Sequence, residues 1–216
     1  MSKIRGLSQL QEALDGALSW RIKEIAYILS NVKKASSSAQ ATYLRAGVPL
    51  LYAHWEGFIK RASEAYLEYV ANQNLTFDQL ANCFVVFGVK GHLNNLVESR
   101  KSAASIEAVK FMRSSGATVA NISLSNAVNT DSNLTSTTFA NIAMSLGVDI
   151  ERYAAYSNLI DESLVTRRNK IAHGEYLDID VKAFESLVDE VLTLLQTYKN
   201  DVENLASTSA YRVAAA

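Results

Sequence analysis

Apolar residues recur at three- and four-residue steps through the first 34 residues, and this pattern is the strongest constraint on the fold. The stripe consists of Leu7, Leu10, Leu14, Leu18, Ile22, Ile25, Leu29 and Val32. Because this spacing places the apolar side chains on one helical face, residues 7–34 are predicted to form a long amphipathic helix. Such a face must be buried against similar elements, so the sequence predicts a helical bundle.

Two further stripes support the same fold. One ends near residue 72, and Gly47 and Pro49 inside it predict a kink or a fresh start, so the helix is assigned to residues 50–72. The other runs from Phe184 to Leu205, with Asp180 placed to cap its first turn. About half of the 216 residues are apolar, which is enough for a large core.

The character of the sequence changes between residues 74 and 148. Ser114 to Thr138 is rich in Ser, Thr and Asn, and Asp131 is its only charged residue, which is typical of loops. The expected elements are helices near 76–99, 104–114 and 139–146 and one short strand at 117–124. We therefore interpret residues 1–216 as one all-α domain of four to five long helices, with residues 74–148 as an inserted, partly helical, loop-rich subdomain.

Composition excludes several classes of protein. A formal net charge of −1 argues against a surface that tracks nucleic acid as a whole, so any RNA contact must use a local basic patch. Cys83 is the only cysteine, which excludes an internal disulfide and a thiolate metal site. The three histidines are scattered without a metal-binding spacing, and we predict no metal and no cofactor.

The sequence shows neither a secretion leader nor a membrane-spanning run. No basic-then-apolar leader follows Met1, and the longest apolar runs, such as Cys83 to Phe87, fall far short of the roughly 20 residues that a membrane span needs. We expect a cytoplasmic protein without a membrane partner.

One segment carries chemistry that the bundle does not require. It reads Arg167-Arg168-Asn169-Lys170-Ile171-Ala172-His173-Gly174-Glu175. Arginine stabilises charge on a phosphate, and histidine moves a proton near neutral pH. The segment should end a helix that begins near Asp149, because Gly174 tolerates the left-handed backbone found just past a helix end.

Arg168 interrupts an apolar stripe that otherwise contains Ile160, Leu164 and Ile171. A guanidinium at such a position needs a carboxylate, a phosphate or a wet cleft. Asn169 lies four residues before His173, so its amide could orient the ring. Arg168 and His173 diverge by about 140° on an ideal helix, so they converge only if the last turn loosens or a second subunit contributes one of them.

An earlier helix offers a matching element. Tyr52, Glu56 and Lys60 follow at four-residue spacing along the border of its apolar stripe. Glu56 is the natural candidate to hold Arg168 if the two helices face each other. The aromatic residues of the helices are expected to be core rather than a base-stacking platform, and this set is Trp20, Trp55, Phe58, Tyr66 and Tyr69.

The motif from Arg168 to His173, with Glu56 and Lys60 on an earlier helix, resembles the HEPN family of all-helical RNA-cleaving and nucleotide-binding domains. The similarity covers both ends of the chain and is looser across residues 74–148. The chain looks like a bacterial subgroup with a long insertion between the second helix and the motif helix.

The resemblance implies a metal-independent endoribonuclease that forms a two-fold homodimer. RNA supplies the 2′-hydroxyl nucleophile, and the products would be a 2′,3′-cyclic phosphate and a 5′-hydroxyl. The implied roles are catalysis by Arg168 and His173, support by Asn169, Glu56 and Lys60, and RNA binding by Lys170, Arg167 and Arg61. Family members commonly act as toxins or defence nucleases, so an antitoxin or defence-system protein is a further expected partner.

Two alternatives remain open at this point. One is a HEPN module that binds a nucleotide or a protein without cleaving RNA. The other is a purely structural helical interaction protein whose Arg168 pairs with Glu56.

Overall fold

The computed structural model describes residues 3–98 and 102–213. Met1 and residue 99, the last of the predicted 76–99 helix, lie outside these ranges. The described chain is all-α, as predicted, and its only β pairing consists of isolated bridges between Thr76 and Val119 and between Leu80 and Arg212. None of the described helices combines the length and apolar character that crossing a bilayer requires.

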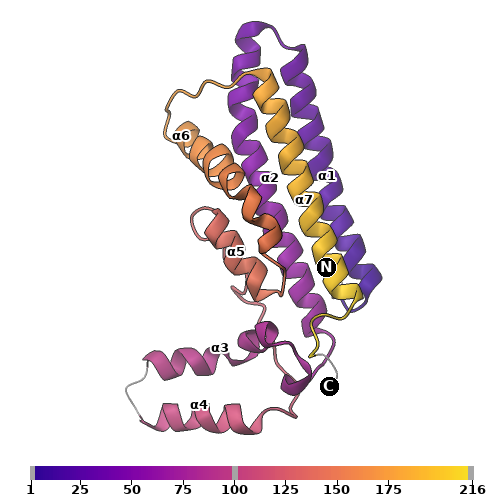
Figure 1. Ribbon diagram of the computed structural model, residues 1–216, viewed down its shortest axis with the longest axis vertical. Helices are drawn as coiled ribbons and strands as arrows, with labels where there is room; N and C mark the ends of the chain where they lie inside the picture. The colour runs from indigo at the N-terminus through magenta and orange to yellow at the C-terminus, as the bar shows by residue number, and fades with distance from the viewer. Residues whose placement is uncertain (1–2, 99–101, 214–216) are drawn as a thin grey trace.

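Three long helices lie side by side along the long axis of the molecule (Figure 1). They are α1 (Leu7–Lys34), α2 (Ser37–Ala71) and α7 (Val181–Ser207). The bounds of α1 are those that its apolar stripe predicts. At the start of α7, the Asp180 carboxylate accepts a hydrogen bond from the Ala183 amide at 2.7 Å, so the predicted cap is confirmed.

Helix α2 begins 13 residues before the predicted position, because Gly47 and Pro49 do not cause a fresh start. Pro49 removes one amide donor, but the chain stays helical around it. Gly47 is buried, and the ring of Phe184 on α7 packs directly against its backbone. Packing between α2 and α7 therefore outweighs the unfavourable helix propensity of these two residues.

We expect Gly47→Ala to lower the free energy of unfolding by about 1–3 kcal/mol, because the added methyl group would overlap a buried ring that has no room to move. The new Cβ would lie 2.7 Å from Cε2 of Phe184. Urea unfolding measures the effect. Gly91→Ala is the matched control, since Gly91 is helical and exposed and no described atom lies within 4 Å of its Cβ position, and it should stabilise by about 0.5–1 kcal/mol. Equal effects of the two substitutions would contradict the packing argument.

Within residues 74–148 the described chain forms a short 3₁₀ turn, Phe77–Gln79, and three helices: α3 (Asn82–Glu98), α4 (Ser102–Ser114) and α5 (Ser136–Ser145). Helices α3 and α4 form a hairpin that projects beyond the end of the long bundle, whereas α5 packs on α2 (Figure 1). The predicted strand at 117–124 is wrong. Only Val119 makes a bridge there, because its partner segment turns into the 3₁₀ helix at Phe77.

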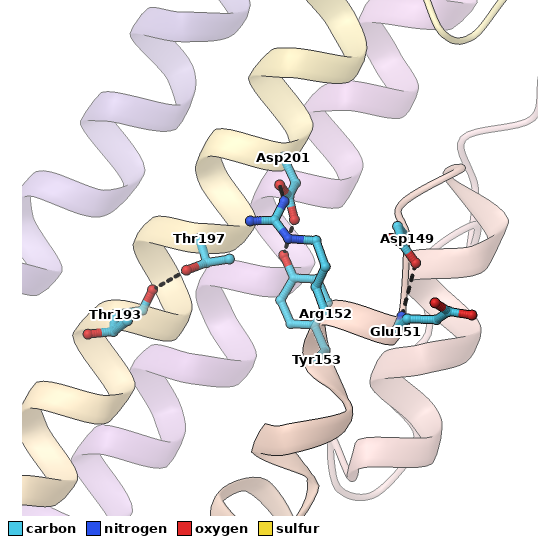
Figure 2. Close-up of polar contacts among 7 residues, drawn as sticks. All are labelled: Asp149, Glu151, Arg152, Tyr153, Thr193, Thr197 and Asp201. Atoms are coloured by element: carbon cyan, nitrogen blue, oxygen red, sulfur yellow. Dashed lines mark hydrogen bonds and ion pairs between the residues drawn. The ribbon is translucent and has the colours of Figure 1, made fainter.

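The segment before the motif is not the single α-helix predicted from Asp149. It winds as a 3₁₀ helix (Glu151–Tyr156, η2), a π-helix (Leu159–Thr166, η3) and a short α-helix (Arg167–Ala172, α6). Figure 2 shows how η2 is attached: Arg152 and Tyr153 both reach Asp201 on α7. The Tyr153 hydroxyl donates to this carboxylate at 2.7 Å. Asp201 therefore ties the start of the motif segment to the bundle.

Two predictions about the core are wrong at neighbouring positions of α1. Ile22 is 41% exposed and Trp20 is 49% exposed, although both were expected inside. Between them Arg21 is buried, with only 7% exposed, because its guanidinium packs between aromatic rings of α1 and α2. The remaining members of the predicted aromatic set, Trp55, Phe58, Tyr66 and Tyr69, are buried.

Candidate functional site

Arg168 lies half-buried on α6 and faces α2. Its guanidinium carbon is 5.0 Å from the ring centroid of Tyr52. Nη1 donates hydrogen bonds to Oδ1 of Asn133 at 3.0 Å and to Oδ1 of Asn169 at 2.7 Å. All three partners are neutral, so they fix the position of the guanidinium without cancelling its charge.

Asn133 was not predicted as a site residue, because it lies 35 residues before Arg168 in a loop without periodicity. Two aromatic residues of α2 hold this loop in place. The Leu134 amide donates to the Tyr52 hydroxyl at 2.8 Å, and Trp55 Nε1 donates to the Leu134 carbonyl at 3.4 Å. Both backbone groups of Leu134 are thus satisfied by α2, which presents the preceding Asn133 to Arg168.

The same loop is also attached to the motif segment. The amide and hydroxyl of Ser136 donate to the two carboxylate oxygens of Asp161, at 2.7 and 2.5 Å. Asp161 belongs to the π-helix directly before α6. The end of the predicted insertion therefore helps to build the site.

Glu56 does not pair with Arg168 as expected. The ion pairs found among the described residues do not include these two side chains, because Tyr52 and the two asparagines occupy the positions around the guanidinium. Glu56 nevertheless acts on the same tyrosine. Burial raises the pKa of Tyr52, the Glu56 carboxylate raises it further, and the Leu134 amide and Arg168 oppose the change. Tyr52 therefore stays a neutral phenol at physiological pH.

His173 is exposed at the end of α6. Gly174 has φ +79°, and the amides of Gly174 and Glu175 donate to the carbonyls of Ile171 and Lys170 at 3.1 and 2.9 Å. This pattern is a Schellman motif, so the predicted glycine stop is confirmed. The oxygen of the Asn169 amide group, which was expected to orient the His173 ring, accepts a hydrogen bond from Arg168.

The helix end does not bring Arg168 and His173 together. From Arg167 to Ala172 the chain is regular α-helix, and its last turn is closed by the Schellman bonds rather than loosened. The π-helix lies before Arg168 and leaves the angle between the two side chains unchanged. A divergence of about 140° therefore persists within one subunit.

The basic residues predicted to contact RNA fall into two groups. Arg167 and Lys170 lie on α6, half-buried and exposed respectively, next to Arg168. Lys60 is exposed on α2, one turn after Glu56. Arg61 is separate, because it lines a groove between α2 and α1 with Trp20 and other α1 residues.

Residues that could bind a metal ion do not gather in the described chain. Within residues 3–98 and 102–213, no group of three or more His, Cys, Asp or Glu side chains is close enough to hold a metal ion.

The bundle and the arginine-to-histidine motif together define a HEPN-like domain. A family model described as RiboL-PSP-HEPN matches residues 17–204, which is most of the chain. The protein therefore belongs to this HEPN family, and the resemblance inferred from the motif is confirmed. Membership indicates a nuclease or RNA-binding function of the HEPN type. Neither the curated proteins nor the solved structures contain a match to the chain.

Proposed function

We propose that this protein is a metal-independent RNA endonuclease that acts as a two-fold homodimer. The observation that carries the proposal is the guanidinium of Arg168, which three neutral groups fix and which joins none of the ion pairs found within residues 3–98 and 102–213. A fixed, half-exposed cation in a motif with a histidine five residues later suits the charge that develops on a phosphate during cleavage.

The proposed reaction is a transesterification within the RNA strand. One His173 takes the proton of the 2′-hydroxyl, and the 2′-oxygen then forms a bond to the adjacent phosphorus. Arg168 of the partner subunit stabilises the negative oxygens of the pentacoordinate state. The bond from phosphorus to the 5′-oxygen breaks, and the same His173, now an imidazolium, gives its proton to that oxygen. The products are a 2′,3′-cyclic phosphate and a 5′-hydroxyl.

Surrounding residues have supporting roles in this proposal. Asn169 holds the guanidinium of Arg168. Glu56 helps to keep Tyr52 a neutral phenol, and the ring of Tyr52 lies against the same guanidinium. Lys60, Lys170 and Arg167 provide the local basic patch that a chain of net charge −1 needs in order to attract RNA. A toxin or defence role, restrained by an antitoxin or another defence protein in the cytoplasm, is the biological setting that fits such an activity.

The test is incubation of the purified protein with RNA in EDTA. We expect cleavage with cyclic phosphate ends, and we expect Arg168→Ala and His173→Ala each to lower its rate by about 10²–10⁴-fold. Arg113→Ala and His92→Ala on the α3–α4 hairpin are matched controls, since they remove the same side chains away from the motif.

The other outcomes separate the alternatives. Cleavage that survives in both motif variants would exclude this site. If the wild type does not cleave RNA and the motif variants lose ligand binding, the protein is a binding module. If Arg168→Ala only lowers the melting temperature, the arginine is structural.

A further inference from the structure

The burial of Arg21 on α1 is not explained by the proposed catalytic site. Its guanidinium carbon lies 4.4 Å from the ring centroid of Trp20 and 5.8 Å from that of Phe58 on α2. The apolar stripe predicts that Ile22 is buried at this point of α1, but the buried side chain is that of Arg21. Burial lowers the pKa of Arg21, which reflects the loss of hydration around the charge.

Arg21 lacks the partners that a buried guanidinium normally has. Nη1 donates to the Ala17 carbonyl of its own helix at 2.5 Å, but the buried Nε–H makes no hydrogen bond to any residue that the structure describes. The ion pairs of residues 3–98 and 102–213 include none to Arg21. A buried cation without an anion is costly, so an anion that reached this guanidinium would be bound favourably.

A groove of about 670 Å³ lies next to this guanidinium, between α1 and α2. Its volume falls within the roughly 300–1,000 Å³ typical of small-molecule sites. The lining residues that matter chemically are Trp20, Arg21, Arg61 and Glu12. Glu12 is exposed and pairs with neither arginine among the ion pairs found in the described chain.

Trp20 adds an aromatic surface to the two cations. One face of its ring contacts Arg21, its ring and that of His54 form a T-shaped pair with 5.3 Å between centroids, and 49% of the residue remains exposed. An exposed tryptophan held by neighbours is a suitable stacking platform for a nucleobase. Arginine is the side chain best suited to bind phosphate in a bidentate manner.

We propose that the groove between α1 and α2 binds a nucleotide unit, with the base stacked on Trp20 and the phosphate held by Arg21 and Arg61. Arg61 follows Glu56 by five residues, so it points about 140° away from the catalytic face of α2. The groove is therefore a second site rather than part of the first. A free mononucleotide and an RNA strand present the same base and phosphate groups to the groove. If the occupant is an RNA strand, the groove extends the binding of the proposed ribonuclease substrate, and this form of the inference rests on the proposed function.

The test titrates the protein with AMP and with a short 2′-O-methyl oligoadenylate, which lacks the 2′-hydroxyl and cannot be cleaved. Both the quenching of Trp20 fluorescence and the anisotropy of labelled ligand are measured. We expect Trp20→Ala to weaken binding about 5- to 150-fold, the range for losing one stacked base. Arg61→Ala should also weaken binding and reduce the slope of log affinity against log salt. Lys23→Ala, which removes an exposed α1 charge outside the groove, is the control.

Arg21→Gln tests the buried guanidinium itself, with circular dichroism to check folding. Because this variant can fail to fold, the inference is judged by ligand binding to Trp20→Ala and Arg61→Ala, whose side chains are more exposed. Tighter binding of the oligomer assigns an RNA strand, whereas equal binding of AMP assigns a mononucleotide. Unchanged affinity in both variants overturns the inference, and so does binding of an oligoglutamate peptide in place of either nucleotide.

The two proposals fail in different ways. RNA cleavage by the wild type, combined with unchanged ligand binding in Trp20→Ala and Arg61→Ala, overturns the groove and leaves the ribonuclease. Nucleotide binding that these variants lose, in a protein that does not cleave RNA, overturns the ribonuclease and leaves the groove.

Discussion

An equimolar mixture of the Arg168→Ala and His173→Ala proteins, each inactive alone, is expected to recover about a quarter of the wild-type RNA-cleaving activity. The reason is geometric. Arg168 faces α2, whereas His173 is exposed at the closed end of α6, about 140° around the helix. A two-fold dimer can join Arg168 of one subunit with His173 of the other.

The expected recovery follows from counting intact sites. After the subunits exchange, half of the dimers carry one variant of each kind, and each such dimer has one complete site and one that lacks both residues. If Arg168 and His173 of the same subunit acted together, every site in the mixture would lack one residue and no activity would return. The control mixes Arg168→Ala with the double variant Arg168→Ala/His173→Ala, which should stay inactive. A monomeric wild type that cleaves RNA would also contradict the prediction.

The long helices were predictable from sequence because each one repeats its own signal many times. Eight stripe residues support α1, and the ends of α7 and α6 are marked by single residues with specific chemistry, Asp180 and Gly174. The same kind of signal identified Arg168 as a candidate site residue, because it interrupts an apolar stripe whose members Ile160 and Leu164 are buried.

Long-range contacts determine the parts that sequence patterns missed. Asn133 joins the site because Tyr52 and Trp55 bind the backbone of Leu134, about 80 residues away in sequence, and no local period reports such a contact. The π-helix was missed because steps of four and five residues are hard to distinguish over eight positions.

Arg21 and Ile22 show a different limit. A stripe assigns the apolar residue to the core, but here the aromatic rings of Trp20 and Phe58 surround the guanidinium and Ile22 remains outside. An inside-outside rule based on hydrophobicity alone cannot anticipate this arrangement. Such exceptions are informative because local sequence rules tend to fail at functional or strained sites.

Trp55→Ala is expected to lower the free energy of unfolding by about 3–5 kcal/mol, because the substitution empties a fully buried site. The indole is 0% exposed and lies 5.1 Å, between centroids, from Phe139 of α5. It also donates to the Leu134 carbonyl, so its loss should release the loop that presents Asn133 to Arg168. RNA cleavage should therefore fall even at temperatures where the variant is folded.

Trp20→Ala provides the matched control, since it removes the other tryptophan of the chain from a half-exposed position and should cost less than about 1 kcal/mol. Urea unfolding measures both variants, and amide hydrogen exchange at Leu134 reports on the loop directly. Faster exchange at Leu134 in Trp55→Ala alone would show that α2 holds this loop in place. If exchange there is unchanged while stability falls, Trp55 supports only the core, and the position of Asn133 must depend on Tyr52 and on the bonds between Ser136 and Asp161.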